Sequence, residues 1–393
     1  MSGRLISKIC PFFMVPVDSP VNEERYLGSR TNPGHIYENG SGKFIYPVIK
    51  LGDKQVHLDK LCLVDFKGDT IYKCFELQQV TQGMDTHYLV LSYRKDNETD
   101  IYHTKGFKGE EEGYKSLLNK VTLMELDSIK VKFEVAESGA DIWFSFVDKE
   151  NRAIEIKIKE NKERNDSFGL IAPVGNASEA PDKFPVIYLK KVNMVQMKGT
   201  EIFVKINGED MEPIKLVPLC NFKRAYLSRY AYAINIKELN NDFEGVLEPV
   251  EADGSSEEIP VDNCIYSINM NSGHPEIESV RAAEPGSEMR ISFSPPIPDI
   301  VSLKDNIEIR GRFSLSVDEI KGIMGGVYSL KKTGVSVNIK MNPRKGWQPM
   351  PGRLWMKTYL WDCDMKLLQG SCQVKTRWYR NGMNTAYYKL KEE

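Results

Sequence analysis

The sequence predicts an all-β protein with a minor α-helical component. From about residue 43 to residue 390, apolar and polar residues alternate with a period of two in one segment after another. Successive side chains of a β-strand point to opposite faces of the sheet, so this alternation is typical of strands with one buried face. Antiparallel strands of this kind close into few architectures. We therefore expect two tandem antiparallel domains, each a β-barrel or a β-sandwich, with a lipocalin-like barrel among the alternatives.

The clearest hairpin lies at residues 140–158. Its first strand carries aromatic and aliphatic residues at even positions, and its second strand repeats this pattern with isoleucines after a polar turn at 148–151. Two such runs joined by a short polar turn predict a hairpin with one buried face. The buried positions are Ile142, Phe144, Phe146, Ile154, Ile156 and Ile158. The same alternation predicts strands at 129–135, 201–206, 289–293, 307–315 and 335–341.

Two helices are predicted where the period changes. Near residues 111–122, apolar side chains from Tyr114 to Val121 recur at helical spacing behind an acidic run. The second helix lies near 317–324, where Ser316 and Glu319 form a capping box before two glycines end the helix.

The domain organisation follows from the length of the chain and from one break in the alternation. A chain of 393 residues exceeds the roughly 250–300 residues at which a single hydrophobic core stops growing. Glycine, proline and acidic residues interrupt the strand pattern at 208–221. We expect an N-terminal β-domain at 1–207, a linker at 208–221 and a C-terminal β-domain at 222–393.

Charge and composition limit the kinds of partner that we expect this protein to bind. The 53 basic and 55 acidic side chains nearly cancel, so no summed positive field attracts nucleic acid. No stretch approaches the roughly 20 apolar residues that a membrane span needs. Seven cysteines without a Cys-x-x-Cys pair favour free thiols in a reducing compartment. We expect a cytoplasmic protein without nucleic-acid or membrane-spanning partners, and the sequence leaves its oligomeric state open.

No motif for a metal or for an organic cofactor is present. The five histidines never recur at the i, i+2 or i, i+4 spacing of metal ligands. The sequence also contains no Walker loop, no G-x-G-x-x-G and no G-x-S-x-G. We therefore predict neither a metal nor a cofactor.

The strand predicted at 224–236 carries the first group of candidate ligand contacts. Its even face includes Tyr226, Tyr230 and Tyr232, whereas Arg229 stands among alanines on the odd face. A buried guanidinium needs a carboxylate, a carbonyl or a ligand anion. We predict that Arg229 and the three tyrosines bind a ligand. The alternatives are an internal ion pair of Arg229 and an ordinary ladder of aromatic side chains.

Three residues are candidates for acid–base catalysis. Glu76 lies on a polar strand face at 70–80 that Tyr72, a further ligand-binding candidate, is predicted to share. An apolar cavity beside Glu76 would raise the pKa of its carboxyl group and make it a general acid, whereas a solvated face would not. His87 and His103 complete the candidates because imidazoles titrate near neutral pH, and a buried structural role is their alternative.

The tryptophans gather in the C-terminal block. At 353–362, Trp355 and Trp361 share one face of a predicted strand whose other face is also apolar. This arrangement predicts either a ring-stacking platform for a sugar or polycyclic ligand, or a wide hydrophobic core.

Three functions are consistent with these features. The first is a protein that binds a small apolar molecule in a barrel or interdomain pocket and transforms it by acid–base isomerisation, hydration or cyclisation. The second is a carbohydrate-active or carbohydrate-binding sandwich that uses the tryptophans, and the third is a non-catalytic assembly protein. In layout alone, the two tandem β-domains resemble the lipocalin-like hydratases and cyclases of terpenoid metabolism, and none of their motif residues is matched.

Overall fold

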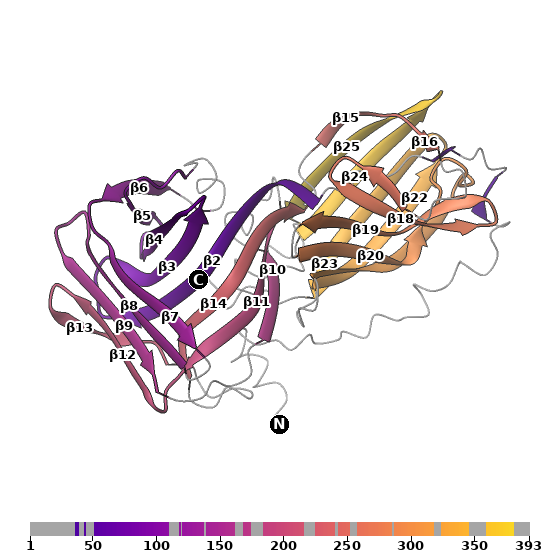
Figure 1. The fold of residues 1–393 in the computed structure, drawn as a ribbon. Coiled ribbons are helices and arrows are strands. Elements are labelled where there is room, and N and C mark those ends of the chain that lie inside the picture. The colour runs from indigo at the N-terminus through magenta and orange to yellow at the C-terminus, as the bar shows by residue number, and fades with distance from the viewer. Residues whose placement is uncertain are drawn as a thin grey trace, which may run out of the picture. The chain divides into compact units, whose positions relative to one another are not determined.

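The structure is a computed structural model of the chain. It describes residues 36–38, 43–44, 51–109, 118, 120–136, 139–161, 168–173, 184–215, 225–239, 243–251, 258–284, 287–317, 324–345 and 359–380. Every named secondary-structure element in these ranges is a β-strand, as Figure 1 shows. The predicted all-β fold class is therefore confirmed.

The chain divides into two compact units. Unit 1 comprises Met1–Gln55, Ile171–Ile187 and Lys237–Glu393, and unit 2 comprises Val56–Leu170 and Tyr188–Ile236. The division expected from the sequence, at 208–221, differs from this one because the chain passes between the units four times. Each passage falls inside a strand.

Unit 2 is built on a sheet of 13 strands among the described residues, some of which extend into unit 1. Ten strands follow the order β6-β5-β4-β3-β2-β13-β12-β9-β8-β7, while β14 pairs with β2 and β11, and β11 pairs with β10. The bounds are β2 (Leu51–Lys67), β3 (Tyr72–Gln82), β4 (Asp85–Arg94), β5 (Thr99–Thr104), β6 (Val121–Leu126), β7 (Lys130–Ala136), β8 (Gly139–Val147), β9 (Ala153–Glu160), β10 (Phe168–Pro173), β11 (Phe184–Gln196), β12 (Thr200–Ile206), β13 (Glu209–Pro213) and β14 (Ala225–Leu239).

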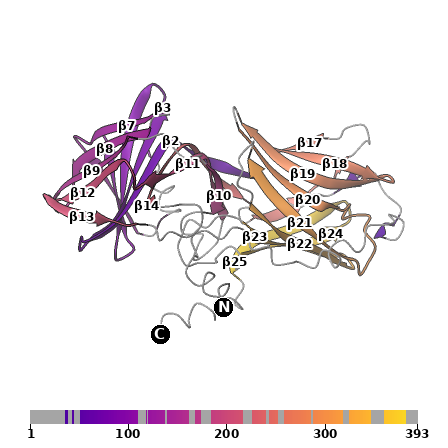
Figure 2. The same cartoon turned by 90° about the horizontal axis from the view of Figure 1, so that it is seen from below.

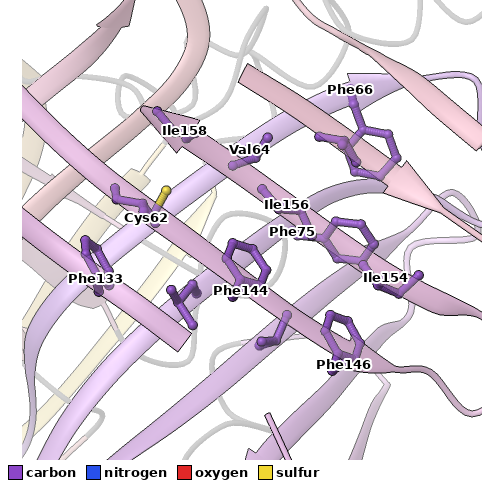
Figure 3. Packing of buried hydrophobic residues seen from close by; sticks show 14 of the residues in the cluster. Cys62, Val64, Phe66, Phe75, Phe133, Phe144, Phe146, Ile154, Ile156 and Ile158 are labelled. Carbon is purple, nitrogen blue, oxygen red and sulfur yellow. The ribbon is translucent and has the colours of Figure 1, made fainter. Parts of the chain in front are cut away.

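The main core of unit 2 lies where this sheet folds over itself. Figure 3 shows Val64 and Phe75 of β2 and β3 packed with Phe144 of β8 and Ile156 of β9. The predicted hairpin at 140–158 is confirmed as β8 and β9, and all six of its even apolar positions are buried. Removing such side chains from water is the main stabilising contribution to a fold of this kind.

A second, smaller core covers the other face of β4 and β5. Leu89, Leu91 and Ile101 are buried there, and Phe107 and Leu118 from the β5–β6 connection pack against them. Strands β5 and β6 are parallel. With the main core on one face and this smaller core on the other, β4 and β5 bury side chains on both faces.

Unit 1 contains a ten-stranded antiparallel sheet in the order β15-β25-β24-β23-β22-β21-β20-β19-β18-β17. Figure 2 shows successive strands running side by side as a meander. The bounds are β15 (Phe243–Leu247), β17 (Glu258–Val261), β18 (Cys264–Asn271), β19 (His274–Glu284), β20 (Ser287–Ile297), β21 (Glu308–Val317), β22 (Met324–Thr333), β23 (Ser336–Lys345), β24 (Tyr359–Leu368) and β25 (Ser371–Arg380), and a separate pair joins β1 (Lys43–Phe44) to β16 (Val250–Glu251).

A short N-terminal segment at 36–38 is fixed to unit 1 by a buried polar cluster. The Tyr37 hydroxyl donates a hydrogen bond to Glu276 Oε1 at 2.6 Å, and its ring stacks on His274 at 4.1 Å. His274 Nδ1 lies 3.4 Å from Asp299 Oδ2. Tyr37 also forms an isolated antiparallel bridge with Leu303.

Both predicted helices fall largely outside the described residues. Of the first, 111–117 and 119 are not described, and Val121 and Thr122 belong to strand β6. Of the second, 318–323 are not described, while Val317 ends β21 and Met324 begins β22.

Candidate functional site

The candidate site is one face of the sheet in unit 2, here called the Glu76 face. It consists of Asp65 of β2, then Cys74, Glu76 and Gln78 of β3, the odd-numbered residues from His87 to Tyr93 of β4, His103 of β5 and Arg229 of β14. Residues paired across antiparallel strands point to the same side, and the pairs Asp65 with Cys74, Glu76 with Leu91, and Leu89 with His103 define this face. All three predicted acid–base residues and Arg229 therefore share it.

Glu76 is the carboxyl group of this face whose pKa departs most from its ordinary value. It is 8% exposed, and it accepts a hydrogen bond of 2.5 Å from the Tyr93 hydroxyl and one of 2.6 Å from Gln78 Nε2. Burial raises the pKa of Glu76 because the charged form loses its hydration, and the bonds from Tyr93 and Gln78 only partly oppose this rise. A carboxyl group in this state can hold a proton closer to neutral pH than an exposed one.

Gln78, in the same polar group, carries a hydrogen-bond acceptor that no described residue satisfies. The Gln78 Oε1 atom is buried and has no hydrogen-bond partner among the described residues. Tyr93 donates to Glu76, and burial followed by the negative charge of Glu76 raises the pKa of its hydroxyl well above the usual range. Tyr93 is therefore a fixed donor, whereas Gln78 offers an unused acceptor beside it.

Arg229 forms the internal ion pair that was the alternative to ligand binding. Its Nη1 atom lies 3.1 Å from Asp65 Oδ2 and donates to the Leu227 carbonyl oxygen at 3.1 Å. The side chains of Arg229 and Asp65 remain 28% and 21% exposed. Burial has the largest single effect on the pKa of Arg229 and lowers it. The charge and hydrogen bond of Asp65, together with the electrostatic effects of Cys74 and Glu76, outweigh burial, so the net pKa is raised and the guanidinium stays charged.

The two histidines lie on the Glu76 face but away from Glu76. His87 pairs with Val80, four residues along β3 from Glu76, which is roughly 13 Å at ~3.3 Å per residue. Phe107 packs against both imidazoles, with ring centroids 5.9 Å from His87 and 5.6 Å from His103. The structure therefore brings Glu76 and Arg229 into one polar group and leaves the histidines in an aromatic cluster.

The tyrosines of β14 lie on the face opposite Arg229, as the alternation predicted. Tyr230 is buried in the main core and donates to Glu160 Oε2 at 2.7 Å, and Tyr226 packs against the same core. Tyr232 is half-buried, with Lys191 Nζ 5.5 Å from its ring centroid. These three side chains therefore do not line the Glu76 face.

The expectation that Tyr72 shares a face with Glu76 is wrong. The pairing of β3 with β4 shifts between Tyr72 and Cys74, and this irregularity reverses the alternation at Lys73. Tyr72 therefore points into the main core beside Phe75. Its hydroxyl group donates to Asp100 Oδ2 at 3.1 Å.

The C-terminal tryptophans that the structure describes are core residues. Trp361 is 0% exposed, and Trp378 donates from Nε1 to the Leu239 carbonyl oxygen at 2.9 Å. A wholly buried ring offers no stacking surface, so Trp361 does not form an accessible platform. Trp355 lies outside the described residues.

Asp65, Gln78 and Tyr93 of the Glu76 face were not among the candidates selected from the sequence. Asp65 follows Leu61 and Leu63 on one face of β2, and it is the partner that holds Arg229. An acidic residue at the end of an apolar face was the available signal. It could not reveal the partner, because Asp65 and Arg229 are 164 residues apart in the sequence.

Comparisons with known proteins add no relative. The chain matches no family model, no curated protein and no solved structure. Within the described ranges, no three His, Cys, Asp or Glu side chains converge as a metal site requires. The same ranges contain no helix long and apolar enough to cross a bilayer.

Proposed function

We propose that unit 2 binds a small, mainly apolar molecule that carries one oxygen function, and that Glu76 exchanges a proton with it. One observation carries this proposal: a buried carboxyl group held by Tyr93 and Gln78 lies on a sheet face next to Leu89 and Leu91. Sites for small ligands commonly combine apolar walls with a few fixed polar groups. Perturbed carboxyl groups are also concentrated at catalytic sites.

The chemistry that these groups support is acid–base chemistry. A protonated Glu76 can donate its proton to an alkene, an epoxide or a carbonyl group, and it can recover a proton when water adds or an alkene forms. Arg229 supplies a fixed positive charge that would stabilise developing negative charge on an oxygen. Isomerisation, hydration and cyclisation are the reaction classes that need no further group.

We infer the polar contacts of the ligand from the protein groups on this face that have hydrogen-bonding capacity left. Gln78 Oε1 would accept a hydrogen bond from a hydroxyl group, and the exposed part of the Arg229 guanidinium would bind an oxygen with negative charge. An alcohol or a carboxylic acid with a hydrocarbon body satisfies both conditions better than a pure hydrocarbon.

The cellular setting is part of the same proposal. The described cysteines Cys62, Cys74 and Cys372 carry free thiols, and all three are buried. Burial raises the pKa of the Cys62 and Cys74 thiols, which keeps them unreactive. Unpaired thiols favour a reducing compartment, so we place the protein in the cytoplasm.

A displacement titration tests the proposal. Anilinonaphthalene sulfonate serves as the fluorescent probe, and a long-chain fatty acid and the alkanol of equal length serve as competitors. Both competitors should displace the probe from the whole chain. The Glu76→Gln variant should bind the alkanol at least about tenfold more weakly than the unmodified protein. Glu134→Gln, at a carboxylate whose side chain is 70% exposed, is the matched control. Absence of displacement, or equal competition in Glu76→Gln, would overturn the proposal.

Arg229→Met separates ligand binding from folding. The variant should reduce the affinity for the fatty acid more than that for the alkanol, because only the acid carries a full negative charge. Arg310→Met, in unit 1 with a 53% exposed side chain, is the control for the substitution itself. Equal losses for the acid and the alkanol would mean that Arg229 acts only through its internal ion pair.

A further inference from the structure

A hollow of ≈ 630 Å³ lies on the sheet of unit 1. It crosses five neighbouring strands in the order β15-β25-β24-β23-β22. Val337, Met365 and Val374 point to the core side of these strands and are buried. The alternate positions point away from the core and provide charged and polar side chains to the hollow.

The register places these side chains in rows across the strands. Lys375 of β25 pairs with Glu244 on one side and with Asp364 on the other, and Asp364 pairs with Asn338 of β23. Asn338 in turn pairs with Lys331 of β22. One row therefore carries acidic, basic and amide groups in sequence along the hollow.

Part of this row is already paired within the sheet. Lys375 Nζ lies 2.5 Å from Glu244 Oε2, and Asn338 Nδ2 donates to Asp364 Oδ1 at 2.7 Å. Lys331 and Lys366 are exposed and form no ion pair with a described residue. These two lysines lie on the strands either side of β23, so roughly 10 Å separates their strands at ~4.8 Å per step.

The remaining lining residues define the ligand chemistry further. Thr333, Ser336 and Gln373 add hydroxyl and amide groups, and none of the residues that line the hollow is aromatic. The site therefore offers no ring on which a nucleobase or a polycyclic molecule would stack. It offers many hydrogen-bond donors and acceptors and two lysines without an acidic partner among the described residues.

We infer that this hollow binds an acidic oligosaccharide, whose hydroxyl groups face the hydroxyl and amide side chains and whose carboxylates bind Lys331 and Lys366. Its volume falls within the roughly 300–1,000 Å³ of small-molecule sites, which suits a short saccharide. The site lies wholly within unit 1, and it does not depend on Glu76 or on the function proposed for unit 2.

Isothermal titration calorimetry of the whole chain with a linear triuronate tests this inference. The triuronate should bind, and its methyl ester, which keeps the hydroxyl groups but lacks the charges, should bind at least about tenfold more weakly. The double variant Lys331→Ala/Lys366→Ala should bind the triuronate more weakly than the unmodified protein by a similar factor. Lys105→Ala, at an exposed lysine of unit 2, and Glu76→Gln should leave the affinity unchanged.

Two further measurements keep the inference falsifiable. Ser336→Trp fills the hollow from an exposed position and should abolish binding while the midpoint of thermal unfolding stays the same. A short polyglutamate peptide tests whether charge alone is sufficient. The inference is overturned if the triuronate does not bind, if its ester binds equally well, or if the peptide matches its affinity.

Discussion

The Tyr93 hydroxyl lies 2.5 Å from Glu76 Oε2, between adjacent strands β4 and β3. The tyrosine thus gives the buried carboxyl group a donor where water is excluded. Burial nevertheless keeps the pKa of Glu76 above its ordinary value. A tyrosine on one strand and a glutamate on the next therefore make the central polar contact of the Glu76 face.

Glu76 should make the stability of the protein pH-dependent. Because its folded-state pKa is raised, the unfolded chain releases this proton first as the pH rises past the ordinary value of 4.5. The free energy of unfolding should therefore fall between that value and the folded-state pKa, and the loss persists above it. Glu76→Gln should remove this slope and stabilise the protein at neutral pH, as urea unfolding across this pH range would show. An unchanged slope would mean that Glu76 is hydrated in the folded state.

Tyr93→Phe should destabilise the protein by about 1–3 kcal/mol, because the buried Glu76 carboxyl group loses a hydrogen-bond donor. The same change should raise the pKa of Glu76 further, since the Tyr93 bond lowers it. Denaturant unfolding measures the first effect, and carbon-detected NMR titration of the Glu76 carboxyl measures the second. Tyr226→Phe, at a half-buried tyrosine whose side-chain hydroxyl group makes no hydrogen bond to a described residue, is the control and should have little effect. A pKa of Glu76 that stays constant in Tyr93→Phe would contradict this account.

Arg229 and Asp65 should be energetically coupled. Both side chains are partly exposed, which reduces the gain from their ion pair, so Arg229→Met should cost about 1–2 kcal/mol. Asp65→Asn should cost a similar amount, and the double variant should cost less than the sum of the two. A double-mutant cycle from urea unfolding measures this coupling. Additive costs would show that the pair contributes nothing to stability.

Phe144→Ala should be the most destabilising of these changes, by about 3–5 kcal/mol, since it opens a cavity in the main core of unit 2. The conservative change Ile156→Val in the same core should cost only about 0.5–1.5 kcal/mol. Val147→Ala, at a 50% exposed position of the same strand as Phe144, serves as the control. Chemical denaturation gives all three values, and a cost for Phe144→Ala as small as that of the control would refute the packing described.

Tyr37→Phe tests how the N-terminal segment is held. The variant keeps the ring that stacks on His274. It removes the hydroxyl group that donates to Glu276, a residue that is 1% exposed, and that accepts a hydrogen bond from the Asp299 backbone N–H at 3.3 Å. Unit 1 should lose about 1–3 kcal/mol of stability. Limited proteolysis should also cleave near residues 36–38 faster than in the unmodified protein. Unchanged cleavage would show that backbone pairing and stacking hold the segment without these hydrogen bonds.

The sequence by itself determined the fold class and the direction of many side chains. The hairpin at 140–158 and the two faces of β14 follow from alternation, because a strand of regular geometry has a fixed period of two. The presence of Glu76, His87, His103 and Arg229 on strands was predictable for the same reason. Local periodicity is a property of neighbouring residues, so a linear pattern records it.

Only the tertiary structure decided which of these residues meet. Asp65 and Arg229 are distant in sequence, and their contact depends on the pairing of β2 with β14. Tyr72 points into the core because the pairing of β3 with β4 is irregular at one residue. The composition of β3 does not reveal this irregularity. The division into units likewise depends on strands that pass from one unit into the other. Register, strand order and bulges arise from long-range pairing, and one strand's pattern is compatible with many partners.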